Sequence, residues 1–182
     1  MKKLLLLFTM VLFMTGCGLP TNLNNTPQKQ AELLLAKYQS LDADVIDDLN
    51  RAVAEEVNFN TAQRDRYKTL MEKQYKELTY EIKETMEDGD TATIRVEVEV
   101  FDFHKVLLDA DTYLQANPTE FQDSNGVYDS SKFMDYRLDQ LEASNERVKY
   151  TLELTATKVD NNWEIDSLTT TDEAKINGIY TY

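Results

Sequence analysis

Apolar residues in the first half of the chain recur every three to four positions in three successive segments. The first begins at Thr26-Pro27, because a threonine followed by a proline is typical of a helix N-cap and first helical position. The pattern is interrupted at Ser40–Asp44 and at Asn58-Phe59-Asn60. Asn60 and Gln63 then have the spacing of a capping box, with asparagine in place of serine or threonine. The spacing predicts three helices. Tyr67, Leu70, Met71 and Tyr75 share one face of the third.

From Leu78 onward the hydrophobic period falls to two residues, which indicates β-strands. The residues expected to face inward in the first strand are Leu78, Tyr80, Ile82 and Met86. Asp88-Gly89-Asp90 is a strong hairpin signal. In the returning strand every second residue from Ala92 to Val100 is apolar, so one face should be buried and the other solvated. The alternation shifts at Phe101-Asp102-Phe103, which predicts a bulge or the end of the strand.

A helical region is expected between this hairpin and a second one. Residues 104–117 have helical spacing up to Asn117-Pro118, and residues 119–130 are predicted to form a loop. Ser130 or Asp129 should cap a further helix. The second hairpin combines the alternating residues 148–156 with a return through Trp163 and Ile165. The tail Ile176–Tyr182 should either add an edge strand or fray.

One domain over residues 27–182 accounts for this order of elements. The predicted class is α+β, with N-terminal helices packed on a twisted antiparallel sheet of two hairpins and a helical insertion between the hairpins. A domain of this size buries roughly 68–70% of the surface that its chain would expose. Packing alone can therefore stabilise it, which matters because the chain has a single cysteine and can form no internal disulfide.

The N-terminus has the parts of an export signal. Lys2 and Lys3 precede an apolar run of 11 residues, Leu4–Met14. Such a run is too short to span a bilayer, which needs roughly twenty residues. Met14-Thr15-Gly16-Cys17 resembles the lipobox of bacterial lipoproteins, in which the cysteine sulfur is lipidated before cleavage on its N-terminal side. The alternative, an ordinary buried cysteine, does not explain why the one thiol stands at this position.

The lipobox resemblance implies a cellular location and a membrane topology. Residues 1–16 would be the signal peptide, Cys17 the lipidation site, and residues 17–26 the lipidated cysteine with a flexible tether. Two long acyl chains hold a protein firmly on a membrane. The expected location is the extracytoplasmic face of the cell membrane of a Gram-positive bacterium, with the membrane as a partner through the lipid on Cys17.

The charge of the chain excludes one class of partner. Its formal net charge is −14, and removal of residues 1–16, which hold two lysines and no acid, would change this to −16. Nucleic acid repels such a domain, so no nucleic-acid partner is expected. Cationic partners, such as basic peptides or metal ions, are compatible with this charge.

Two phrases resemble those of small bacterial lipoproteins with an NTF2-like or cystatin-like domain. The first is Asp88-Gly89-Asp90 followed by Ala92 and Ile94, and the second is Trp163 with Ile165 and Asp166. The resemblance extends from Gln30 to Thr170 and implies helices folded over a sheet to form a cone. Some enzymes of this fold use an aspartate and a tyrosine inside the cone, for which the candidates here are Tyr80, Tyr150 and Asp102.

The remaining motifs predict no catalytic, cofactor or metal site. His104 is the only histidine, and no serine is marked as its partner. None of the five glycines forms a phosphate-binding loop. The segment Asp123–Asp129 resembles a calcium loop, but alignment by its glycine puts Phe121 and Lys132 where carboxylates are required. An Asn-Gly turn, with Asp129 near a helix cap, is expected instead.

These observations predict a lipid-anchored extracytoplasmic binding or interaction module without catalysis. A second hypothesis is a small-molecule enzyme or carrier that uses the interior of the cone. A third concerns the signal peptide, since Leu7–Met14 resembles the hydrophobic peptide pheromones that some bacteria cut from lipoprotein signal peptides. A generic apolar signal region also explains this segment.

Overall fold

The computed structural model describes residues 25–181 of the 182-residue chain. The helices are α1 (Pro27–Ser40), α2 (Ala43–Glu55), α3 (Thr61–Glu77), α4 (Phe103–Ala116), the 3₁₀ helix η1 (Pro118–Phe121), α5 (Ser130–Ala143) and α6 (Thr170–Ile176). The strands are β1 (Thr79–Asp88), β2 (Thr91–Phe101), β3 (Arg147–Val159) and β4 (Asn162–Ile165). The predicted signal peptide and Cys17 lie outside the described residues.

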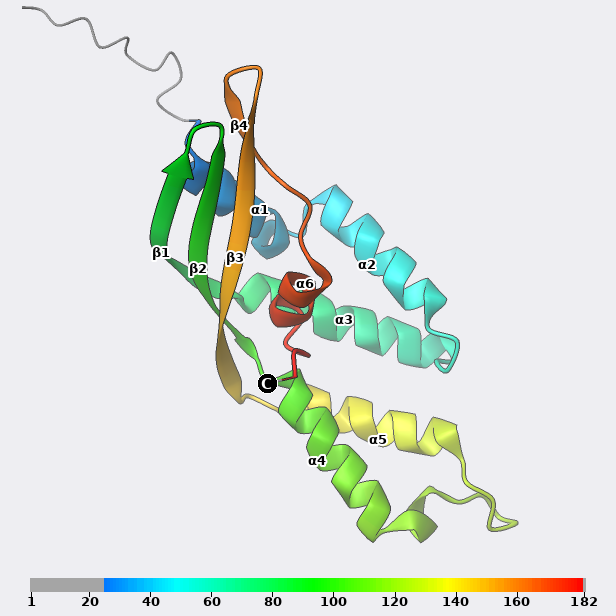
Figure 1. Cartoon of the computed structure of the whole chain (residues 1–182). Coiled ribbons are helices and arrows are strands. Elements are labelled where there is room, and N and C mark those ends of the chain that lie inside the picture. Colours follow the sequence, from blue (N-terminus) through cyan, green and yellow to red (C-terminus); the bar gives the residue numbers. More distant parts are fainter. Residues whose placement is uncertain (1–24, 182) are drawn as a thin grey trace, which may run out of the picture.

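Helices cover one face of a four-stranded antiparallel sheet with the strand order β1-β2-β3-β4 (Figure 1). Helix α1 contacts all four strands, whereas α2 packs on α3. Alternate apolar residues of β2 and β3 form the buried face, and Ile94, Val96, Val98 and Leu152 have 0% exposed surface. The predicted α+β class, with two hairpins and a helical insertion between them, is confirmed.

Local signals determine the helix starts at Thr26 and Asn60 as predicted. Thr26 accepts a backbone N–H of α1 at 3.1 Å, and Pro27 occupies the first helical position. Leu41 ends α1 in the left-handed conformation, with φ 53°, and the Asp42 side chain caps α2. Asn60 and Gln63 form the reciprocal capping box at the start of α3. Because these interactions join residues close in sequence, they were predictable without knowledge of the fold.

The end of the predicted flexible tether is attached to the domain. The side-chain amide of Asn25 donates to the backbone carbonyl of Trp163 at 3.3 Å and accepts from the backbone N–H of the same residue. Thr26 is held as the cap of α1. The last two residues of the predicted tether are therefore part of the fold, and residues 17–24 lie outside the described part of the chain.

Strand β1 contains a bulge that the alternation did not predict. Its register against β2 shifts between Ile82 and Glu84, which leaves Lys83 as an extra residue. Beyond such a shift, side chains that would have pointed to one face of the sheet point to the other face. Thr85 consequently pairs with the buried Ile94, while Met86 lies on the other face with 48% exposed surface. The prediction that Met86 faces inward was therefore wrong.

The insertion between the hairpins is a pair of helices with a small core of its own. Ala110 of α4, Phe121 of η1 and Phe133 of α5 form a separate buried cluster. Asp129, rather than Ser130, caps α5, and its carboxylate accepts two backbone N–H groups. The predicted loop 119–130 contains the short helix η1 and an isolated bridge between Gln122 and Tyr128.

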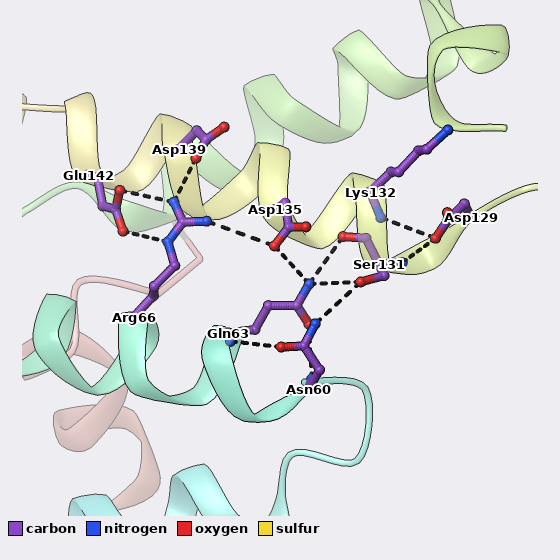
Figure 2. Close-up of polar contacts among 9 residues, drawn as sticks. All are labelled: Asn60, Gln63, Arg66, Asp129, Ser131, Lys132, Asp135, Asp139 and Glu142. Carbon is purple, nitrogen blue, oxygen red and sulfur yellow. Dashed lines mark hydrogen bonds and ion pairs between the residues drawn. The ribbon is translucent and has the colours of Figure 1, made fainter. Parts of the chain in front are cut away.

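A polar network attaches the insertion to α3 (Figure 2). The side-chain amide of Gln63, 1% exposed, donates to Ser131 and, at 2.9 Å, to Asp135. One helical turn further along, the Arg66 guanidinium binds Glu142 at 2.8 and 2.9 Å and Asp139 at 2.6 Å. These carboxylates hold the pKa of Arg66 above its ordinary value. Both residues of α3 therefore bind the exposed side of α5 directly.

A short helix that the sequence did not predict, α6 (Thr170–Ile176), precedes the tail Ile176–Tyr182, for which an edge strand or fraying was expected. Thr169 caps α6 by accepting the N–H of Asp172 at 3.1 Å, and Ile176 is fully buried. The segment after α6 is then fixed by a bond from the backbone N–H of His104 to the carbonyl of Gly178, at 2.8 Å. No strand follows β4 within residues 25–181. The seven-residue helix has too few apolar positions to produce a helical pattern in the sequence.

Candidate functional site

The residues suggested by the cone resemblance have packing and capping roles. Tyr80 and Tyr150 are the register partners of Val98 from opposite sides, so they share the inward face of the sheet. The Tyr150 hydroxyl donates to the carbonyl of Tyr180 at 3.2 Å. Asp102, 6% exposed, caps α4 by accepting the N–H of Lys105 at 3.0 Å. The three side chains thus lie in the core and at its end, and a catalytic role for them stays a prediction.

The two other motifs are accounted for by local structure. His104 lies in the first turn of α4, half-buried, with its backbone N–H bound to Gly178. The Asp123 carboxylate accepts the N–H groups of Asn125 and Val127 at 2.8 and 2.9 Å, and these bonds lower its pKa. Gly126 follows with φ +79°. The expected turn, with Asp129 as a helix cap, is confirmed.

A cleft of about 340 Å³ lies among α1, α2, α3 and α6, away from the predicted cone interior. Figure 1 shows α2 and α3 side by side, with α6 beside the end of α3 nearer the sheet. The buried side chains of Leu49, Met71 and Tyr75 contribute to its floor. Tyr38 and Tyr67, both half-buried, line it from two sides. Three tyrosines from two helices therefore face one hollow.

The tyrosines of this cleft are held in defined positions. The rings of Tyr38 and Tyr75 meet edge to face, with centroids 5.1 Å apart and planes at 78°. The Tyr75 hydroxyl donates to the side-chain oxygen of Asn177 at 2.9 Å. On the other side, Tyr67 packs edge to face against Phe59 at 5.3 Å. Ring contacts and one hydrogen bond thus restrict the rotamers of all three, which is the preorganisation that a binding site needs.

Carboxylates surround the tyrosines. Asp48 and Glu55 of α2 and Glu173 of α6 line the cleft and are exposed to solvent. Burial raises the pKa of Tyr38 to about 12, with a further contribution from Glu173 and Asp48. Burial, Tyr38 and the same two carboxylates raise the pKa of Tyr75. The three phenols, Tyr67 included, therefore stay neutral at physiological pH in a field of negative potential.

The sequence contained part of the signal for this cleft. Tyr67, Met71 and Tyr75 share one face of a predicted helix, and Tyr38 lies at helical spacing in another. These positions were interpretable only as core, and the acidic run Asp42–Asp48 as a solvated helix face. The convergence of α2, α3 and α6 requires contacts across more than a hundred residues, such as Tyr75 with Asn177, which are 102 positions apart. Helical periodicity carries no information on such contacts.

A second, smaller hollow of about 200 Å³ lies between the helical insertion and the rest of the domain. Its lining is mostly apolar and includes Phe59, Leu107 and Met134. Tyr67 lines both this hollow and the larger cleft. Arg137 also lines it, with its guanidinium 3.1 Å from Asp111 and against the ring of Phe133. This hollow has fewer charged groups than the larger cleft and less room for a ligand.

Two further features bear on the kind of protein. Among residues 25–181, no helix is long and apolar enough to cross a membrane. Over the same range, histidine, cysteine and carboxylate side chains form no group of three or more that could hold a metal ion.

No protein-family model matches the chain, and no curated protein matches it. Among solved structures, the chain is similar to the crystal structure of a "putative lipoprotein (ycdA)" from Bacillus subtilis subsp. subtilis str. 168. The sequence identity is 12% and the TM-score is 0.42, and the match covers 84% of this chain. It covers 47% of that chain, so this protein spans about half the length of its neighbour.

Proposed function

We propose that this chain is a lipid-anchored binding protein of the extracytoplasmic membrane face, with the cleft among α1, α2, α3 and α6 as its ligand site. The tyrosine-lined cleft is the observation that carries the proposal. At about 340 Å³ it falls within the range of roughly 300–1,000 Å³ that small-molecule sites occupy. Its mixture of fixed aromatic rings and a few polar groups is typical of such sites.

The location of the cleft separates this proposal from the alternative of an enzyme or carrier that uses the cone interior. The space between helices and sheet is filled by side chains such as Ile94, Val96 and Leu152, which are fully buried. A cleft between helices is open to solvent without any rearrangement of that core. We also propose that the domain is NTF2-like or cystatin-like, because helices cover one face of its sheet as that resemblance implies.

Anchoring rests on the lipobox resemblance of Met14-Thr15-Gly16-Cys17 and is tested at the cysteine. Cys17→Ser removes the thiolate that would accept the lipid. We expect the wild-type protein to partition into detergent and the variant to lose membrane attachment or to persist as the uncleaved precursor. The thermal midpoint of the domain should not change. A cleaved, hydrophobic Cys17→Ser protein in the detergent phase would refute lipidation.

Binding is tested by filling the cleft. Ala52 is an exposed residue of α2 that lines it, whereas Ala54 is exposed on the same helix outside it. Ala52→Trp should block the cleft without disturbing the core, and Ala54→Trp is the matched control. The full chain is incubated with a small-molecule extract of the cell envelope and analysed by native mass spectrometry. We expect a bound mass with wild type and Ala54→Trp that Ala52→Trp loses. The same bound mass in all three proteins, or none in any, would contradict the proposal.

A further inference from the structure

We infer that the ligand of this cleft is a small organic cation, an amine or a quaternary ammonium compound. The inference rests on the proposed function and adds the chemical class of the ligand. Three features of the cleft carry it: the sign of its charge, the arrangement of its aromatic rings, and the lack of a metal-binding set of side chains.

The charged lining is negative. Asp48, Glu55 and Glu173 contribute three carboxylates, and Arg51 is the one cationic residue among the lining side chains, for a formal charge of −2. The Arg51 guanidinium is ion-paired with Asp48 at 2.8 Å, on the exposed side of α2. Anionic ligands would be repelled both by the lining and by the net charge of −14 on the whole chain.

The aromatic rings suit a cation as well. The faces of aromatic rings attract ammonium and guanidinium groups within about 6 Å of the centroid. Tyr38 and Tyr75, whose rings lie nearly perpendicular to each other, both line the cleft. The field of Asp48 and Glu173, which opposes ionisation of these phenols, stabilises a cation at the same place.

An organic cation fits better than a metal ion. A hard metal ion takes several oxygen ligands at short distance, and the described residues contain no group of three or more carboxylates or histidines placed to supply them. The faces of tyrosine rings bind favourably to a diffuse, weakly hydrated charge that carries apolar surface, as an organic cation does. The cleft, at about 340 Å³, is large enough to hold a small molecule of this kind, so the cation need not be part of a protein.

The first test compares a cation with a neutral molecule of the same shape. Choline and its uncharged carbon analogue 3,3-dimethylbutan-1-ol form one pair, and butylamine and butan-1-ol form another. Isothermal titration calorimetry with the full chain should give at least one cation a dissociation constant roughly tenfold or more below that of its neutral analogue. Added salt should weaken the cation only. Equal affinity within both pairs, or no binding of either cation, overturns the inference.

Variants assign the effect to the cleft. Asp48→Asn with Glu173→Gln should weaken binding of the cation several-fold, whereas Asp47→Asn with Glu164→Gln makes the same change of charge at exposed positions outside the cleft. Arg51→Gln removes the cationic group and should strengthen binding. Equal losses in the two double variants would mean general surface attraction and would overturn the inference.

Two further outcomes separate this inference from the proposed function. If succinate binds and Ala52→Trp abolishes its binding, the cleft is a ligand site but not one for cations. If a lysine-rich peptide binds while choline and butylamine do not, the occupant is a protein rather than a small molecule. In either case the extract experiment with Ala52→Trp and Ala54→Trp still decides whether the cleft binds a ligand at all.

Discussion

Gly178 follows Asn177, the C-cap of α6, and lies against Gln74 of α3 and Phe101 at the end of β2. Its φ is +71°, and a Cβ atom built there would overlap the carbonyl oxygen of Phe101 and the side-chain amide nitrogen of Gln74. Gln74 is fully buried and makes two hydrogen bonds to the backbone of Phe101, at 2.8 and 3.1 Å. Gly178→Ala therefore forces the amide of Gln74 or the C-terminal segment to move.

The cost has two parts. Left-handed backbone costs an L-residue about 1–2 kcal/mol. Displacement of Gln74 leaves buried groups without partners, at about 1–3 kcal/mol. We expect Gly178→Ala to lower the free energy of unfolding by about 2–5 kcal/mol, which is a large part of the roughly 5–15 kcal/mol of an ordinary domain.

Gly89 provides the matched control. It has φ +63° in the β1–β2 turn, and a Cβ atom there meets nothing within 4 Å. Gly89→Ala should cost only the backbone part, about 1–2 kcal/mol. Urea unfolding followed by circular dichroism gives both values, provided that the two variants share the m-value of wild type. If Gly178→Ala lowers the free energy of unfolding no more than Gly89→Ala does, the steric overlap with Gln74 and Phe101 does not contribute to stability, and the reasoning is refuted.

Two other predictions concern the tyrosines and the α3–α5 network. Because the pKa of Tyr38 is about 12 when folded and about 10 when unfolded, the unfolded chain ionises first and stability should fall as pH rises above about 10. Between about pH 10 and 11 Tyr38→Phe should lose about 1 kcal/mol less stability than wild type, and equal losses in urea titrations would contradict this. Arg66→Ala should cost about 1–2 kcal/mol through loss of its contacts with α5, and Arg51→Ala less than about 1 kcal/mol, because its single ion pair is exposed. Thermal melts that rank the two variants the other way would contradict the role of the network.

Much of the fold could be predicted because its signals are local. The caps at Thr26 and Asn60, the turn at Gly89 and the alternation of β2 each involve residues a few positions apart, so their energies depend little on the rest of the chain. The bulge at Lys83 was not predictable, because it depends on how β1 pairs with β2. It changes which side chains of β1 point toward the core. A polar residue such as Gln74, buried to bond Phe101, also has no pattern of its own in the sequence.

The sequence by itself determined the order of helices and strands up to the second hairpin and the acidity of the chain, and it predicts an anchor at Cys17. Only the tertiary structure decided where a ligand could bind. The cleft exists because α1, α2, α3 and α6 are brought together by contacts between residues as far apart as Tyr75 and Asn177. Hydrophobic periodicity reports which face of an element is buried, but the same pattern serves many helix arrangements. Whether apolar and acidic faces meet around a hollow therefore depends on packing between distant segments.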